Sequence, residues 1–337
     1  MRLNRRQFLS QSSAAATASL VAAAVFPTAI AQGQSAVNSE IPIIDCHQHL
    51  WDRSKFTLPW IKAGSLLDRS YVMSDYLAAI EGTGIKNSIY MEVDVEPSQQ
   101  QAEAEHLIEI CKSKTAPTIA AVVSGRPASE SFVAYVKQFK DSPYIKGIRQ
   151  VLHGGGTPAG YCLQDSFLRG IRSLGELNLS FDLCLRPQEL TDGAALAEKC
   201  PNTKFILDHC GNADPEAFLN PGDSRLTDAK PGHTADEWRR GLDRVASAKN
   251  VICKISGIVA RVPKMWSAED LAPIVNHCLD AFGPQRVIFG SDWPVCLNGA
   301  PLRDWVAALK QIIASRPANE QRLLLRDNAI RFYRLVE

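Results

Sequence analysis

Eight short apolar segments alternate with longer amphipathic segments along most of this 337-residue chain. Each apolar segment is rich in Ile, Val, Leu or Phe and is bounded by Gly, Pro or Asn, which predicts a buried strand. The predicted strands are 43–47, 87–93, 118–125, 144–152, 179–185, 204–209, 251–256 and 286–292. Eight strand–helix repeats in about 300 residues predict an α/β fold, a TIM-like (β/α)8 barrel in a single domain.

The amphipathic segments between the strands have the spacing of helices that bury one face. The predicted helices are 74–81, 97–111, 166–177, 235–245, 267–282, 301–313 and 319–335. A doubly wound sheet is the alternative fold, but no Gly-rich dinucleotide-binding turn follows the first strand. Two polar stretches, 52–70 and 212–233, are predicted to be long surface loops, and loops of that length often act as lids.

The N-terminus has the three parts of an export signal in their usual order. A paired arginine at Arg5 and Arg6 precedes Phe8-Leu9, and an uncharged, alanine-rich run then ends in an A-x-A site at 29–31. This order is typical of a twin-arginine signal peptide, cleaved after about Ala31, and it predicts a periplasmic protein that uses the twin-arginine export machinery. Residues 32–40 are expected to be a linker, and 41–337 the barrel domain.

Composition excludes several classes of protein. With 45% apolar and 22% charged residues, the chain is too apolar to be disordered. Residues 1–31 carry three arginines and no acidic residue, so their removal changes the formal charge from +1 to −2, which does not suit a dedicated nucleic-acid binder. No later segment is apolar for long enough to insert stably in a membrane. The nine cysteines form no CxxC pair and are expected to be structural, although one disulfide is left open.

Reactive side chains gather where three predicted strands end. The first strand ends in His47 and His49, whose alternation places both imidazoles on one side of the strand. The sixth ends in His209 and the eighth in Asp292. In a barrel these strand ends meet at one face, where imidazoles and a carboxylate can bind a metal ion or activate water. Glu92, at the end of the second strand, is either a further metal ligand or an ordinary loop carboxylate.

Other side chains near strand ends are candidates for substrate binding. The planar guanidinium groups of Arg149 and Arg186 suit a carboxylate or sugar hydroxyls, and weaker candidates are Arg126, His153 and Arg261. Each arginine can equally form an ordinary salt bridge. Three tryptophans are candidates for the pocket wall or for the core, namely Trp51, Trp60 and Trp293.

Six motifs give the chain a resemblance to the amidohydrolase superfamily of the amidohydrolase-2 type. They are IIDCHQHLWD (43–52), GIRQVLH (147–153), LSFDLCLRP (179–187), FILDHCGN (205–212), VICKISG (251–257) and FGSDWPVCL (289–297). They are similar to the lactonase branch, which includes L-fuconolactonase, L-rhamnonolactonase, 4-sulfomuconolactonase and 2-pyrone-4,6-dicarboxylate lactonase. The resemblance implies a TIM-like barrel that hydrolyses a cyclic ester.

The resemblance also implies a catalytic set of Asp292, His209, His47 and His49, with Asp292 as the general base. The same four residues, with Glu92, are the candidate ligands of one divalent metal ion, Zn²⁺ or Mn²⁺, although a metal-free mechanism is also open. The chain departs from the wider superfamily because its fifth strand carries no His and Lys146 lies early in the fourth strand. A binuclear site is therefore not expected.

Two other functions are left open. A sister branch of metal-dependent decarboxylases shares the HxH pair and the terminal Asp, but it normally adds another metal-binding His. A non-catalytic, periplasmic sugar-binding barrel would not need all four reactive residues. The expected partner is a small lactone, and a homodimer is the default expectation for an enzyme of this kind.

Overall fold

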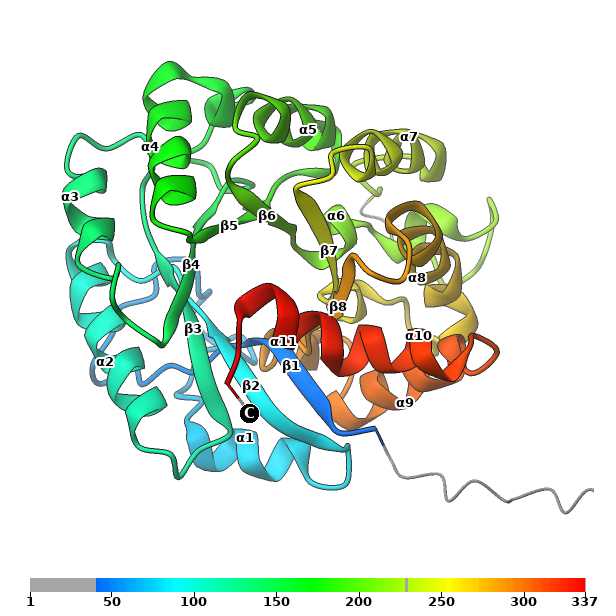
Figure 1. Cartoon of the computed structure of the whole chain (residues 1–337). Helices are drawn as coiled ribbons and strands as arrows, with labels where there is room; N and C mark the ends of the chain where they lie inside the picture. The colour runs from blue at the N-terminus through cyan, green and yellow to red at the C-terminus, as the bar shows by residue number, and fades with distance from the viewer. Residues whose placement is uncertain (1–40, 228–229, 337) are drawn as a thin grey trace, which may run out of the picture. The chain divides into compact units, whose positions relative to one another are not determined.

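The computed structural model describes residues 41–227 and 230–336, which form a barrel of eight parallel strands surrounded by helices (Figure 1). The strands follow one another around the barrel in chain order. They are β1 (Ile43–Gln48), β2 (Ile85–Met91), β3 (Thr118–Ser124), β4 (Ile145–Val151), β5 (Ser180–Cys184), β6 (Lys204–Leu207), β7 (Val251–Ile255) and β8 (Val287–Phe289). The predicted fold is confirmed. The first and last residues of every predicted strand lie within three residues of those of an observed strand.

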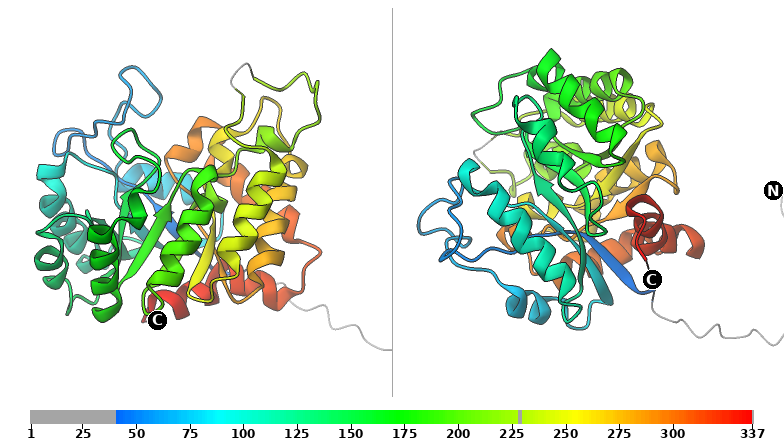
Figure 2. Two further views of the ribbon diagram at one scale, coloured as in Figure 1. Left: turned by 90° about the horizontal axis from the view of Figure 1, so that it is seen from above. Right: turned by 60° about the vertical axis from the view of Figure 1, so that its left-hand side comes forward.

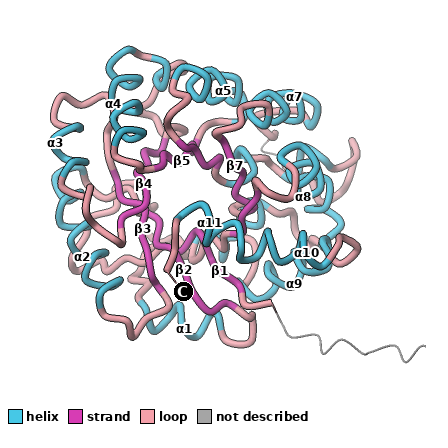
Figure 3. The backbone as a smooth tube through the Cα atoms, in the orientation of Figure 1, coloured by secondary structure: helices cyan, strands magenta, loops and turns pink. Residues whose placement is uncertain are grey.

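Most of the helices form the outer layer around the strands, and the last helix covers one end of the barrel (Figure 3). The helices are α1 (Met73–Ile80), α2 (Gln100–Lys112), α3 (Phe132–Lys137), α4 (Asp165–Glu176), α5 (Leu190–Lys199), α6 (His209–Asn212), α7 (Ala235–Ala246), α8 (Ala268–Phe282), α9 (Leu302–Ile313), α10 (Ala318–Arg322) and α11 (Asn328–Tyr333). Short 3-10 turns lie at 97–99, 161–163, 187–189, 215–218, 258–261 and 295–298, and a π-helical turn at 323–327 joins α10 to α11.

The helix α5 has no counterpart among the predicted helices, and packing explains why its sequence is a weak helix signal. Gly193 lies in the middle of α5, where glycine disfavours a helix. A Cβ atom at this position would lie 2.6 Å from the Cδ1 atom of Leu185, so a larger residue would require that side chain to move. Tertiary contact therefore overrides local propensity.

The barrel closes between β1 and β8 at the carboxyl ends of these strands. The Asp292 amide donates to the His47 carbonyl at 2.9 Å, and the His49 amide donates to the Trp293 carbonyl at 2.8 Å. Below them, the buried Asp45 carboxylate accepts hydrogen bonds from the His47 amide, the Ser291 amide and the Tyr76 hydroxyl. The closure therefore runs through the segments that carry the predicted reactive residues.

The C-terminal helices cover the opposite end of the barrel, where α11 lies across the ring of strands (Figure 1). Ala329 and Tyr333 of α11 are buried against an apolar cluster inside the barrel. The strand residues of that cluster are Ile44, Cys46, Ile89, Met91, Ala120, Val122, Ile206, Ile252 and Ile288. This end of the barrel is a packed core.

The two predicted long loops lie at the other end, away from α10 and α11 (Figure 2). Residues 52–70 form turns without a regular helix or strand, as predicted. The predicted loop 212–233 is partly wrong, because its first residue ends α6 and residues 215–218 form a 3-10 turn in which the Asp214 side chain accepts from the Glu216 amide.

Two further expectations concern the whole chain. Within residues 41–227 and 230–336, no helix is long and apolar enough to cross a membrane. All nine cysteines are free and buried, as expected for structural residues. The predicted signal peptide (1–31) and linker (32–40) lie outside the described residues.

Candidate active site

His47, His49 and Asp292 meet at the carboxyl end of the barrel. The Asp292 Oδ1 atom lies 3.3 Å from His49 Nε2 and 3.6 Å from His47 Nε2. His49 is oriented from behind by its Nδ1 atom, which lies 2.9 Å from the Met91 carbonyl oxygen. All three side chains are buried. The structure therefore brings together three of the predicted reactive residues, two from the first strand and one from the segment after the last strand.

His209 completes the set from the end of β6. Its ring centroid lies 4.5 Å from that of His47, and its Nδ1 atom lies 3.0 Å from the Ser256 hydroxyl after β7. A Cβ atom on Gly257 would lie 2.3 Å from the His209 Nδ1 atom, so only glycine leaves room for this imidazole. The four residues predicted from strand ends thus share one site.

The backbone is unusual at two of these residues. His209 and Asp292 have φ values of 55° and 58°, in the left-handed region that non-glycine residues rarely adopt. Both residues lie just after a strand, two residues beyond β6 and three beyond β8, in the segments that form the mouth of the barrel. Such strain persists only where the surrounding structure holds it, and it is common at functional sites.

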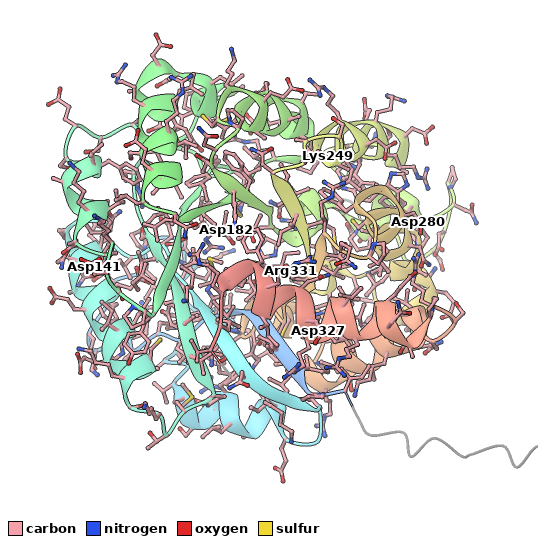
Figure 4. All side chains as sticks on the ribbon, in the orientation of Figure 1. Asp141, Asp182, Lys249, Asp280, Asp327 and Arg331 are labelled. Carbon is pink, nitrogen blue, oxygen red and sulfur yellow. The ribbon has the colours of Figure 1, made fainter. Side chains whose placement is uncertain are left out.

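A buried charged cluster, which the sequence reasoning missed, lies directly behind His47. Lys254 of β7 is 0% exposed, and its Nζ atom lies 2.7 Å from Asp182 Oδ2 and 2.9 Å from Asp208 Oδ1. The same Nζ atom is 3.3 Å from His47 Nδ1. Asp182 lies within the ring of strands (Figure 4). The sequence contains one sign of this cluster, namely a lysine in the otherwise apolar strand VICKI (251–255).

Arg149 and Glu92 form a second buried ion pair beside His47. The Arg149 Nε atom donates to Glu92 Oε1 at 2.6 Å, and an Arg149 amino group lies 3.3 Å from His47 Nε2. Glu92 is therefore engaged by Arg149 and belongs to neither group of side chains that could hold a metal ion among the described residues. Its role as a metal ligand stays a prediction.

A cavity of about 350 Å³ opens in front of these residues. His49, His209, Arg149 and Asp292 form its floor, and 12 further residues complete the lining. These are Trp60, Val93, Asp94, Val151, His153, Gly154, Cys184, Asn212, Gly257, Ala260, Arg261 and Val295. The volume is in the range of small-molecule sites.

The predicted substrate-binding residues have different positions. Arg149 and His153 line the cavity, whereas Arg186, Arg126 and Trp293 are not among its lining residues. The Arg186 guanidinium is held by Glu189 and the carbonyl groups of loop 152–157. Arg126 pairs with Asp94 at 2.8 Å, and the Trp293 ring packs on Tyr71 and Tyr76. Arg186 and Arg126 thus contact lining residues, Gly154 and Asp94, whereas Trp293 is packed in the core.

Burial and charge set the protonation states in the site. Burial lowers the pKa of His47 and of His209, with Lys254 adding to the effect on His47, so both rings are neutral at pH 7. Burial would raise the pKa of Asp292, but His209, His49 and His47 outweigh it and hold that pKa below its usual value. Burial also lowers the pKa of His153 to about 4. The site thus combines a carboxylate of lowered pKa, Asp292, with two imidazoles of lowered pKa, His47 and His209.

The donor set fits one divalent metal ion. One atom each from His47, His49 and Asp292 lie within 4.8 Å of one another, and nitrogen and oxygen donors of this kind suit Zn²⁺. A second group, formed by His47, Asp208 and His209, meets the same distance limit but includes the carboxylate paired with Lys254. Strand β5 contributes Asp182 to the buried cluster and no His. That the site is not binuclear stays a prediction.

These features together define a (β/α)8-barrel enzyme with an HxH pair on the first strand and an aspartate after the last. A model of the amidohydrolase family matches residues 44–335, and the chain belongs to that family. It is 29% identical to L-fucono-1,5-lactonase of Burkholderia multivorans over 87% of this chain and 96% of that protein. It is 21% identical to L-rhamnono-gamma-lactonase of Scheffersomyces stipitis, over 77% of this chain and 87% of that protein.

A solved structure gives the same picture. The chain resembles a Burkholderia multivorans amidohydrolase with bound zinc, with a TM-score of 0.75 and 26% identity over 87% of this chain and 99% of that one.

Proposed function

We propose that this protein is a lactonase, a hydrolase that opens a cyclic ester by the attack of water. The observation that carries this proposal is the environment of the Asp292 carboxylate, which lines the cavity. Two acidic side chains line the cavity, and Asp94 is paired with Arg126. Asp292 contacts histidines, and no lysine or arginine pairs with it among the described residues. It is the ionised carboxylate placed to accept a proton from water.

The remaining residues of the site supply the other parts of the reaction. Asp292 takes a proton from water as the water oxygen bonds to the lactone carbonyl carbon. The imidazoles of His49 and His209 line the cavity in which the oxyanion develops and stabilise it, and His47 packs against both rings. The bond between the carbonyl carbon and the ring oxygen then breaks, and Asp292 returns its proton to the departing alkoxide.

A divalent ion bound by His47, His49 and Asp292 would supply Lewis acidity to the carbonyl oxygen and lower the pKa of bound water. Zn²⁺ and Mn²⁺ are the candidates, and the zinc-bound relative supports Zn²⁺. Elemental analysis of the purified protein identifies the ion.

We further propose a sugar-acid lactone as the substrate, because the curated relatives named above act on L-fucono-1,5-lactone and L-rhamnono-gamma-lactone according to their names. The cavity supports a polyhydroxylated ligand: Trp60 offers an exposed ring, and Asp94, Asn212 and Arg261 offer polar groups. Muconate-type lactones are the comparison substrates.

The test is acid release from a panel of sugar-acid and muconate lactones by the protein without residues 1–31. Asp292→Asn is the diagnostic variant, and carbon dioxide release from aromatic carboxylic acids is measured in parallel. The proposal predicts lactone opening that Asp292→Asn abolishes. An active Asp292→Asn variant would overturn the mechanism, carbon dioxide release alone would favour a decarboxylase, and tight binding without turnover would favour a sugar-binding barrel.

We also propose export by the twin-arginine route to the periplasm, on the basis of residues 5–31. A fusion of these residues to a folded reporter is expected to reach the periplasm. Replacement of both Arg5 and Arg6 by Lys is expected to retain it in the cytoplasm, and export of that variant would contradict the proposal.

A further inference from the structure

The charged cluster behind His47 places a lysine beside a second group of side chains that could hold a metal ion. His47, Asp208 and His209 offer three donor atoms within 4.8 Å of one another. The Lys254 Nζ atom lies 2.9 Å from Asp208 Oδ1 and 3.3 Å from His47 Nδ1, so it faces two members of this donor group. Its third neighbour is Asp182, at 2.7 Å.

The geometry points to Lys254 as a positioning residue whose ammonium group takes the place of a second metal ion, which leaves a single ion site at His47, His49 and Asp292. This inference rests on the hydrolase site described above. It does not depend on the identity of the substrate.

The placement of the charges supports this role. Two buried cations, Lys254 and Arg149, lie within 4 Å of three carboxylates, namely Asp182, Asp208 and Glu92. Removing one partner of such a buried pair leaves an uncompensated charge, which is strongly unfavourable. A divalent ion between Asp208 and His47 would add positive charge beside Nζ, and like charges at this distance repel strongly in a buried site.

Position supports it as well. Lys254 reaches across the barrel from β7 to contact residues from β1, β5 and the end of β6. The Nζ atom donates to Asp182 Oδ2 and lies 3.3 Å from His47 Nδ1, and its charge pairs with the Asp208 carboxylate at 2.9 Å. The lysine thereby fixes the Asp208 carboxylate and the inner edge of the His47 ring, while the outer edge faces Asp292.

The experiment counts metal ions per chain. Wild-type protein and a Lys254→Met variant are stripped with chelator, loaded with Zn²⁺, freed of excess metal by gel filtration and measured by elemental analysis. Lys249→Met is the matched control, because Lys249 is an exposed lysine just before β7 (Figure 4). We expect at most one ion in the wild type and the control, and one additional ion in Lys254→Met.

A spectroscopic measurement distinguishes a gained metal site from a loss of folded structure in Lys254→Met. Titration with Co²⁺ is expected to give one more equivalent of visible absorbance change in Lys254→Met than in the wild type, while a loss of structure alone would reduce it. If Lys254→Met does not fold by circular dichroism, the double variant Lys254→Met/Asp182→Leu removes the charge together with one partner and keeps Asp208. An additional ion is expected there too.

Two results would overturn the inference: two ions bound to the wild type, or equal stoichiometry in the wild type and the folded Lys254 variants. Neither result involves a lactone. If the protein opens no lactone and Lys254→Met still gains an ion, the proposed reaction fails while the role of Lys254 stands.

Discussion

The two ends of the barrel are built from the same strands by opposite means. At the amino end, α11 covers the strands and an apolar cluster fills the interior. At the carboxyl end, the interior holds buried ion pairs, two residues with left-handed backbone and a cavity of about 350 Å³. The difference shows that the packed amino end stabilises the fold. That stability allows the carboxyl end to hold buried polar groups and strained backbone.

The largest expected effect is a loss of kcat on substitution at the carboxyl end of the barrel. Asp292→Asn removes the carboxylate that accepts the proton from water, and loss of a general base lowers kcat by about 10²- to 10⁴-fold. Thermal unfolding should change little, because the amide fills the same space. Steady-state kinetics and calorimetry check both statements, and Asp141→Asn at the outer surface is the control (Figure 4). A large fall in Tm with retained kcat would contradict the assignment of this end to chemistry.

The second effect is a loss of stability on substitution at the amino end of the barrel. Tyr333→Ala removes a buried ring that is 1% exposed, and truncation of a buried aromatic side chain costs about 3–5 kcal/mol of unfolding free energy. The kcat of the folded fraction should be unchanged. Denaturant unfolding measures the loss.

Tyr333→Phe is the matched control for that substitution. Within residues 41–227 and 230–336 the buried Tyr333 hydroxyl has no hydrogen-bond partner, so its removal should leave stability unchanged or slightly higher. A loss with Phe as large as with Ala would show that the ring is not the stabilising part.

A smaller effect concerns the loop beside the cavity. Trp60 lines the cavity, is 41% exposed and donates from Nε1 to the Val93 carbonyl at 2.7 Å. Trp60→Ala is expected to raise KM about tenfold, equivalent to about 1.4 kcal/mol, with a smaller change in kcat. Leu66→Ala in the same loop is the control, since Leu66 is exposed and does not line the cavity. Equal KM values for both variants would remove Trp60 from the binding surface.

The smallest expected effect tests the cost of burying acid groups near the cavity. Burial raises the pKa of Glu103 from 4.5 to about 8, while its Oε1 atom accepts from the Val93 amide at 2.8 Å. Because the folded-state pKa is the higher one, stability is fully present below pH 4.5 and is lost as the pH rises through 8.

Glu103→Gln keeps the acceptor and cannot ionise. Its stability relative to the wild type should therefore be higher at pH 8 than near pH 5. Urea unfolding at several pH values measures this gain, with the exposed Glu105→Gln on the same helix as control. An equal gain at both pH values would mean that Glu103 is ionised throughout.

Much of the site was accessible from the sequence because strand ends of a parallel barrel converge on one face. His47, His49, His209 and Asp292 were predicted from that rule and lie together. The partners of Arg149 and Arg186 were not predictable, because an arginine can reach several neighbours and only the fold decides which carboxylate or carbonyl it meets. Lys254 was missed because a lone lysine in a strand usually marks a solvated edge.

The sequence by itself determined the order of strands and helices, the inward pair at His47 and His49, and the family of the protein. Local periodicity and short motifs carry that information. Only the tertiary structure decided that Lys254 faces His47 and Asp208, that Glu92 pairs with Arg149, and that α11 seals the amino end. These contacts join residues far apart in the chain, and their partners are selected by the closure of the barrel.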